Sequence, residues 1–264
     1  MLQEKPSDHS PHLGSKADLR SKIAFMAAQT SSGSTRSVTY REVAHMIDHT
    51  NLRPEAMRDQ IVRLCQEARD FEFAAAVVNP CYVELAASQL QGSQVKTAAV
   101  VGFPLGATLT SVKCFEATEA LKLGAEEIDM VLNIGALKSG RNEEVRTDIQ
   151  KVAEATHHAG ALLKVILETG LLSDEEKKLA CELSVSAGAD FVKTSTGFLG
   201  GGATVSDVAL MRQVVGPKIG VKASGGIRSA SDVRAMIEAG ANRIGTSSGV
   251  KIIQEMRDQE RTSQ

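Results

Sequence analysis

Hydrophobic residues follow two alternating patterns along the chain. Short apolar runs predict strands, at residues 47–50, 74–78, 97–101, 127–134, 162–168, 191–194, 219–224 and 243–246. Between them lie longer segments with apolar side chains three and four positions apart, such as the one that carries Ile61, Leu64 and Ala68. Strands that alternate with helices in this way are typical of a parallel sheet.

Cap and turn signals support the same order of elements. Thr39 and Glu42 have the spacing of a capping box, and Pro54 is expected to open the helix after the first strand. A Gly-Ala step before four of the strands predicts that each helix there ends in a left-handed glycine, and the steps are Gly124-Ala125, Gly160-Ala161, Gly188-Ala189 and Gly240-Ala241.

The eight strand-then-helix units fit a chain of 264 residues as one α/β domain. They predict a closed (β/α)8 TIM barrel over residues 38–264 rather than an open doubly wound sheet. Residues 1–37 are expected to form a partly mobile N-terminal extension. It is expected to contain a short amphipathic helix around Leu19, Ile23 and Met26 and then a polar linker over residues 30–37.

Composition narrows the classes of partner. Net charge is only -2, and aromatic residues make up 3% with no Trp, which argues against nucleic acid and anionic membranes. The cysteines, at positions 65, 81, 114 and 181, are far apart in segments predicted to be helical, which implies neither a zinc site nor a disulfide framework. No apolar run suits a bilayer or a signal peptide, so we expect a cytoplasmic protein.

Charged side chains interrupt the later strands on one face. Alternation places Asp129, Val131 and Asn133 on the inner side of the fourth strand, and Lys164 and Glu168 on that of the fifth. The sixth and seventh strands add Lys193 and Lys222 to this inner side. Lys193 lies 29 residues after Lys164, and Lys222 lies 29 residues after Lys193, which predicts equivalent places in consecutive units.

Two interpretations of this interior remain open on the residues alone. In the first, Lys193 extends to solvent or pairs with an acid, and the lysines with Asp129, Glu168 and Asp48 form a neutral network that fills the barrel. In the second, Lys193 is a desolvated amine with a lowered pKa that attacks a carbonyl carbon and forms a Schiff base.

The loops after the last two strands favour the second interpretation. They contain Gly225 and Gly226 in one loop, and Ser247 and Ser248 in the other. Glycine permits close approach of the backbone, and N–H groups at a helix start bind anions. Because barrel active sites lie at this end of the strands, we expect a phosphate group there.

With these features the chain resembles the deoxyribose-phosphate aldolase family of class I aldolases. The resemblance covers the chain from about Tyr40 to the eighth unit and is carried by the segments at residues 47–50, 78–80, 101–106, 127–131, 164–169, 191–198 and 221–228. One departure is that Val77 stands where family members often have cysteine.

The resemblance implies reversible cleavage of 2-deoxy-D-ribose 5-phosphate to D-glyceraldehyde 3-phosphate and acetaldehyde. Lys193 would form the Schiff base, Asp129 and Lys222 would donate and accept protons, and Lys222 would also lower the pKa of Lys193. Lys164 would line the substrate site as a cation. The family uses no metal or other cofactor and forms dimers or tetramers, so a homo-oligomer is implied.

Alternatives remain beside this assignment. Another Schiff-base barrel, such as a transaldolase-like enzyme or an aldolase for a different sugar phosphate, has similar requirements. A barrel without activity that binds a phosphometabolite or acts as a scaffold is the other alternative. Asp48, Thr196 and Arg228 are further candidates for contact with substrate, without a committed role.

Overall fold

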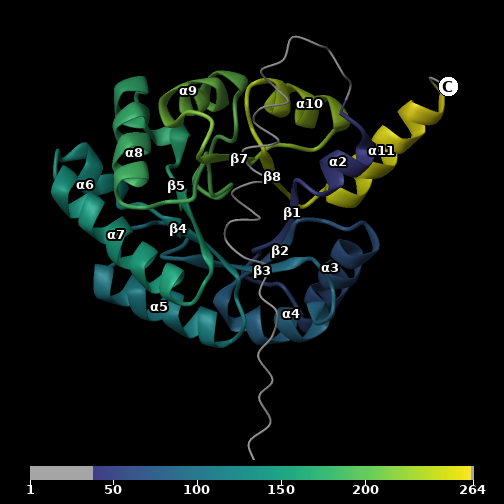
Figure 1. Ribbon diagram of the computed structural model, residues 1–264, viewed down its shortest axis with the longest axis horizontal. Helices are drawn as coiled ribbons and strands as arrows, with labels where there is room; N and C mark the ends of the chain where they lie inside the picture. The colour runs from purple at the N-terminus through teal and green to yellow at the C-terminus, as the bar shows by residue number, and fades with distance from the viewer. Residues whose placement is uncertain (1–37, 263–264) are drawn as a thin grey trace, which may run out of the picture.

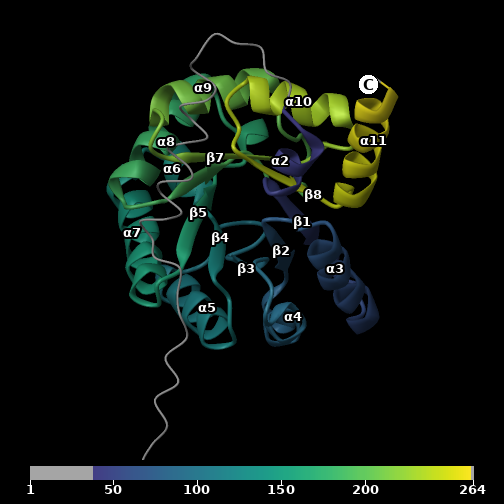
Figure 2. The same cartoon turned by 45° about the vertical axis from the view of Figure 1, so that its right-hand side comes forward.

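Eight parallel strands close into a barrel in the computed structural model, which describes residues 38–262 (Figures 1 and 2). The strands are β1 Ile47–Asn51, β2 Ala75–Val78, β3 Lys96–Val101, β4 Glu127–Val131, β5 Leu162–Ile166, β6 Phe191–Lys193, β7 Gly220–Ser224 and β8 Arg243–Thr246. They pair in chain order, and β8 pairs with β1. The (β/α)8 barrel predicted from the sequence is therefore confirmed. The expected helix and linker of the N-terminal extension lie outside the described residues.

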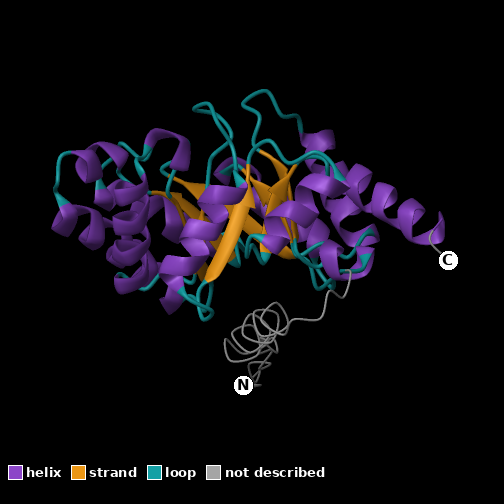
Figure 3. Cartoon of the chain, turned by 90° about the horizontal axis from the view of Figure 1, so that it is seen from above, coloured by secondary structure: helices purple, strands orange, loops and turns teal. Residues whose placement is uncertain are grey.

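Helices surround the strands (Figure 3). They are α2 Tyr40–Ala44, α3 Arg58–Asp70, α4 Val83–Leu90, α5 Thr110–Lys122, α6 Ile134–Lys138, α7 Asn142–His158, α8 Asp174–Ser186, α9 Val205–Val215, α10 Ala230–Glu238 and α11 Gly249–Thr262, with short 3-10 turns η1 Pro80–Tyr82 and η2 Thr169–Leu171. Within residues 38–262, none of these helices combines the length and apolar character needed to cross a membrane.

The barrel interior has an apolar side and a charged side. Small apolar residues from β2 and β3 form a cluster inside it with Leu52, and they are Ala75, Val77, Ala98 and Val100. Val77, at the position where family members often have cysteine, is fully buried there. The inner faces of β4 to β8 and of β1 carry the charged residues instead, while their outward-facing residues pack with the helices in one large apolar core. Only the charged side can therefore hold polar chemistry.

Local signals in the sequence explain several element ends. Thr39 and Glu42 form the predicted capping box at α2, with reciprocal bonds between side chain and backbone. The glycines of the four Gly-Ala steps all have positive φ, at 102° for Gly124, 78° for Gly160, 95° for Gly188 and 110° for Gly240. These left-handed helix ends are confirmed.

Three predicted boundaries were wrong. The strand predicted to run to residue 134 ends at Val131, because Asn133 caps α6 by accepting a hydrogen bond from the backbone N–H of Ala136. The strand predicted to reach Glu168 ends at Ile166, and Glu168 has a left-handed backbone with φ of 59°. The helix expected at Pro54 begins at Arg58, since Pro54 lies in a turn closed by the Ala56 N–H and the Arg53 carbonyl.

Gly106, in the loop after β3, provides a test of backbone packing. Its φ is 68°, and a Cβ atom there would lie 2.0 Å from the Leu132 carbonyl oxygen beyond β4. We expect Gly106→Ala to lower the free energy of unfolding by about 2–4 kcal/mol, because it adds a steric clash to an unfavourable backbone conformation.

Gly140 supplies a matched control for this measurement. Its φ is 69°, but a methyl group added at its Cα atom would have no atom within 4 Å. Gly140→Ala should therefore cost only about 1 kcal/mol in thermal or denaturant unfolding. Equal losses for the two variants would contradict the steric explanation for Gly106.

Candidate active site

Asp129 lies at the centre of the charged side of the barrel. Its Oδ1 accepts a hydrogen bond from Lys164 Nζ at 2.8 Å, and its Oδ2 accepts one from Lys193 Nζ and one from Lys222 Nζ, each also at 2.8 Å. Asp129, Lys164 and Lys222 are 0% exposed and Lys193 only 3%. The structure thus brings the predicted acid and all three predicted amines together.

Three further charged residues complete this group. Arg243, from β8, donates to Asp48 Oδ1 at 2.5 Å and to both carboxylate oxygens of Glu127 at 2.5 and 2.6 Å. Asp48, from β1, also accepts a hydrogen bond from Lys222. Glu127 accepts one from Lys164 at 2.5 Å. We call these seven residues the ion cluster: Asp48, Glu127, Asp129, Lys164, Lys193, Lys222 and Arg243.

The three lysines do not occupy equivalent places, although their sequence spacing is equal. Lys193 and Lys222 are direct neighbours in the register of β6 and β7. Lys164 is instead the neighbour of Phe191, two residues before Lys193. Because side chains on one face of a strand are two residues apart, Lys164 belongs to the next deeper layer. The prediction of equivalence is correct for one pair only.

Glu168 is not an ion-pair partner of Lys164, which pairs with Glu127 and Asp129 instead. Its backbone turns into the left-handed region after β5, and its Oε2 accepts the N–H of Thr196 at 3.0 Å. The interior network considered as an alternative therefore contains Asp48 and Asp129 but not Glu168. Glu168 instead fixes the loop that follows Lys193.

Burial and charge act in opposite directions on the carboxylates of the cluster. Burial alone would raise the pKa of Asp129, but the ammonium groups of Lys164, Lys193 and Lys222 outweigh it and hold this pKa well below its usual range. Burial likewise opposes ionisation of Asp48, yet Arg243, Lys222 and Lys164 lower its pKa. Both carboxylates are therefore ionised at neutral pH.

The amines differ from one another. Burial would lower the pKa of Lys164, but the acids Asp129, Glu127 and Asp48 surround it and raise that pKa above its ordinary value. For Lys193, burial dominates and Lys222 adds repulsion, so its pKa falls from 10.5 to about 8 despite contact with Asp129. A fall of this size increases the neutral fraction of the amine near neutral pH by about 300-fold.

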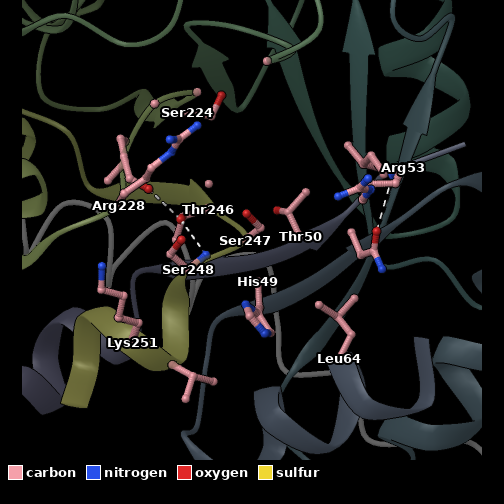
Figure 4. A pocket seen from close by; sticks show the side chains of 18 of the residues that line it. His49, Thr50, Arg53, Leu64, Ser224, Arg228, Thr246, Ser247, Ser248 and Lys251 are labelled. Carbon is pink, nitrogen blue, oxygen red and sulfur yellow. Dashed lines mark hydrogen bonds between the residues drawn. The ribbon is translucent and has the colours of Figure 1, made fainter. Parts of the chain in front are cut away.

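Lys193 also borders a pocket beside the loops that follow several strands. This pocket of about 960 Å³ is lined by the Lys193 side chain and by residues after β1, β6, β7 and β8. Figure 4 shows Ser224, Ser247 and Ser248 around this pocket with His49 and Lys251. Lys164, Lys222 and Asp129 are absent from its lining. Lys193 is thus the cluster amine that a ligand in this pocket meets, whereas Lys164, expected at the substrate, lies beneath it.

The predicted phosphate loops line the same pocket. Gly225, Gly226, Ser247 and Ser248 all contribute to it. The space beside the Gly226 Cα atom is open, because a Cβ added there would have no atom within 4 Å. The N-terminus of α11 begins at Gly249, directly after the serines, and a helix start attracts anions. Arg228 and Thr196 line the pocket as well.

Glu127 and Arg243 were not predicted from the sequence. Glu127 lies two residues before Asp129, so strand alternation alone places it on the inner face. Arg243 opens β8 two residues before Gly245, which pairs with the inward-facing Asp48 of β1. Both residues lie an even number of positions from an inward-facing residue, so the sequence alone could have placed them in the barrel interior. Their partners could not be deduced without the register of the barrel.

Comparisons with known proteins agree with this geometry. The family model described as DeoC/LacD family aldolase matches residues 42–255. A deoxyribose-phosphate aldolase from Halalkalibacterium halodurans is 60% identical over 214 residues, which are 81% of this chain and 95% of the relative. One from Thermococcus gammatolerans is 58% identical over 221 residues, 83% of this chain and 98% of the relative.

Solved structures give the same result. The tetrameric structure of deoxyribose phosphate aldolase from Aeropyrum pernix superposes with a TM-score of 0.80 at 35% identity. The match covers 90% of this chain and 97% of that one. The resemblance inferred from the sequence is confirmed, and the chain belongs to the DeoC/LacD family of aldolases.

Proposed function

We propose that this protein is a class I aldolase that reversibly cleaves 2-deoxy-D-ribose 5-phosphate into D-glyceraldehyde 3-phosphate and acetaldehyde. The observation that carries the proposal is the position of Lys193. Its amine has a pKa lowered to about 8 and borders a pocket. The loops after β7 and β8, which also line this pocket, suit a phosphate. Relatives named deoxyribose-phosphate aldolase at about 60% identity support the choice of substrate.

The reaction begins when neutral Lys193 Nζ attacks C1 of the open-chain aldehyde. Uptake of one proton and loss of water leave an iminium ion between Nζ and C1. Removal of the proton on the C3 hydroxyl then breaks the C2–C3 bond, and its electron pair moves through C2 to the iminium nitrogen. The products of this step are glyceraldehyde 3-phosphate and a neutral enamine. Protonation of C2 and hydrolysis release acetaldehyde and free Lys193.

Asp129 and Lys222 are the proposed proton carriers. The low pKa of Asp129 means that its carboxylate stores no proton in the resting enzyme. Lys222 donates to the same oxygen that accepts from Lys193, at 2.8 Å in both cases. We therefore assign storage of the proton to Lys222 and its transfer to Asp129, with a water molecule completing the path to C3 or C2.

The phosphate is assigned to the loops after β7 and β8. Backbone groups of Gly225, Gly226, Ser247 and Ser248 would hold its oxygens near the start of α11, with Arg228 beside them. A phosphate fixed there orients the sugar with its aldehyde toward Lys193, which reduces the entropy lost on reaching the transition state. Lys164 is assigned to the cluster beneath, as a counter-ion of Asp129 and Glu127.

Two broader expectations accompany this proposal. A homo-oligomer, dimer or tetramer, is supported by the tetrameric relative from Aeropyrum pernix. A cytoplasmic location remains a prediction from the sequence. Sedimentation of the purified full chain tests the first, and fractionation of the source cells tests the second.

Trapping the Schiff base tests the proposed function directly. The full-length protein is treated with borohydride in the presence of acetaldehyde, and the modified peptide is mapped by mass spectrometry. Reduction of the iminium should ethylate Lys193. Ethylation of another lysine would contradict the assignment of the nucleophile. Absence of any adduct would favour the alternative of a barrel that binds a phosphometabolite without catalysis.

Donor specificity separates the proposal from other Schiff-base barrels. We expect condensation of acetaldehyde with glyceraldehyde 3-phosphate and no comparable rate with dihydroxyacetone or its phosphate as the donor. A preference for a dihydroxyacetone donor would favour a transaldolase-like enzyme or an aldolase for another sugar phosphate.

Removal of metal ions should leave the activity unchanged. In the proposed reaction the iminium nitrogen accepts the electron pair, so no metal ion is required as an electrophile. Steady-state cleavage measured after dialysis against excess chelator should equal that of the untreated enzyme. Loss of activity that returns with one added divalent ion would contradict this prediction.

A further inference from the structure

The ion cluster contains more basic than acidic side chains. It has four bases, from β5 to β8, and three acids, from β1 and β4. The strands β2 and β3 add only uncharged Ala75, Val77, Ala98 and Val100 to the interior. Glu168, the buried acid nearest in the sequence to this end of β5, has no ion pair with a described residue and accepts from Thr196 instead. With every group ionised, the cluster would carry one surplus positive charge.

Solvent cannot compensate this surplus. Exposure is 0–6% for every member, so water is excluded from most of the charged atoms. An uncompensated charge in such surroundings is costly, and the group with the weakest stabilisation loses its ionised form. Lys164 contacts two acids within 3 Å and Arg243 contacts two, whereas Lys193 pairs with Asp129 alone. Lys193 is thus the base that gives up its proton.

Arg243 and Glu127 do not contact Lys193 directly and are not among the residues that line the pocket. Asp129 and Lys164 lie between Lys193 and Glu127 in the hydrogen-bond network. Arg243 joins Asp48 to Glu127, and it lies 5.7 Å over the ring of Phe191 on β6, which fixes its position. Through Asp48 it is linked to Lys222, and through Glu127 to Lys164. Arg243 therefore contacts both of the acids, Asp48 and Glu127, that share a lysine with Asp129.

We propose that Arg243 and Glu127 are positioning residues that set the protonation state of Lys193 by fixing the charge balance of the ion cluster. This inference rests on the proposed Schiff-base function and adds to it two residues without contact to substrate. The cluster is neutral when Lys193 is a free amine, because three cations then face three carboxylates. Formation of the iminium restores the surplus charge, and cleavage of the C2–C3 bond to the neutral enamine removes it. Arg243 therefore favours both the attacking amine and the bond-breaking step, whereas Glu127 opposes both and limits the size of this effect.

Opposite charge changes at the two residues should move the pH profile in opposite directions. Arg243→Met removes one cation, so Lys193 retains its proton to higher pH. The acidic limb of the pH profile of kcat/KM should therefore move up by about one pH unit. Glu127→Gln removes one acid and should move the limb down by a similar amount. The double variant restores a surplus of one base and should return the limb close to its original place.

Two controls separate charge from packing. Arg243→Lys keeps the positive charge and should keep the acidic limb in place even if activity falls. Lys177→Met removes a partly buried lysine of α8 that pairs with Asp174 and Asp207, outside the barrel interior, and should not move the limb. Thermal unfolding and circular dichroism of each variant identify those that fail to fold, and the Arg243→Lys and Glu127→Gln pair still tests the proposal if Arg243→Met is among them.

The same profiles are measured on the rate of borohydride-trapped adduct formation with acetaldehyde. Shifts of opposite sign for Arg243→Met and Glu127→Gln support the proposal. Shifts of the same sign, or reduced rates with an unmoved limb, overturn it while leaving the Schiff-base function intact. Failure of the unaltered enzyme to form an adduct at Lys193 contradicts the proposed function itself, so the two failures are distinguishable.

Discussion

Lys193→Met is expected to abolish the acetaldehyde adduct and to reduce cleavage of deoxyribose 5-phosphate by at least about 10⁴-fold, as removal of a covalent nucleophile does. Methionine has nearly the length of lysine, so the barrel interior stays filled. Asp129 keeps hydrogen bonds from Lys164 and Lys222 after the change. The variant should therefore fold with undiminished stability, since a destabilised buried amine has been removed.

The measurement combines borohydride trapping with steady-state kinetics and thermal unfolding. Lys178→Met, at an exposed lysine of α8, is the matched control and should retain full activity and the adduct. An adduct in the Lys193 variant at the original rate would show that another amine is the nucleophile. A large fall in melting temperature would contradict the view that burial of the Lys193 amine destabilises the folded protein.

The periodicity of the sequence was sufficient for the barrel and for much of the site. Apolar runs separated by helical spacing predicted the eight strands because each parallel strand is buried on both faces. A lysine inside such a run, at positions 164, 193 and 222, was conspicuous for the same reason. Glycines beside small polar residues after β7 and β8 suggested loops for a phosphate, and the structure places these loops in one pocket with Lys193.

What the sequence could not provide is the register between strands. Equal spacing suggested equal height for the lysines, but β5 is offset so that Lys164 lies beside Phe191 and below Lys193. Alternation identifies which side chains face inward, yet not which of them meet across the barrel. Arg243 and Glu127 start β8 and β4 and are far apart in the chain, so their ion pair depends on closure of the barrel.

The predicted ends of β4 and β5 were wrong for a local reason. The apolar pattern continues past both ends, through Leu132 and Ile134 and through Leu167, so periodicity alone extends the strands. Asn133 ends the first by capping a helix, and Glu168 ends the second by entering the left-handed region. Asparagine is a common cap, whereas a left-handed glutamate has no general sequence signal.

Lys222→Leu is expected to impair the reaction in two separable ways. Loss of the cation beside Asp129 Oδ2 strengthens the attraction of that carboxylate for the Lys193 proton, so the pKa of Lys193 rises from about 8. Trapping of the adduct near neutral pH should slow by about 10-fold or more and recover as the pH is raised. Turnover should fall by about 10²–10⁴-fold and should not recover at high pH, because the proton donor for the enamine is gone.

Lys222→Arg separates these two effects. Its guanidinium keeps the positive charge, so the pH dependence of adduct trapping should remain close to that of the unaltered enzyme. Because a guanidinium does not release its proton at accessible pH, turnover should stay as low as in the leucine variant. Leucine and arginine variants with the same, unshifted trapping profile would exclude the electrostatic role of Lys222. Normal turnover in the arginine variant would instead transfer the proton-carrying role to Asp129 and water.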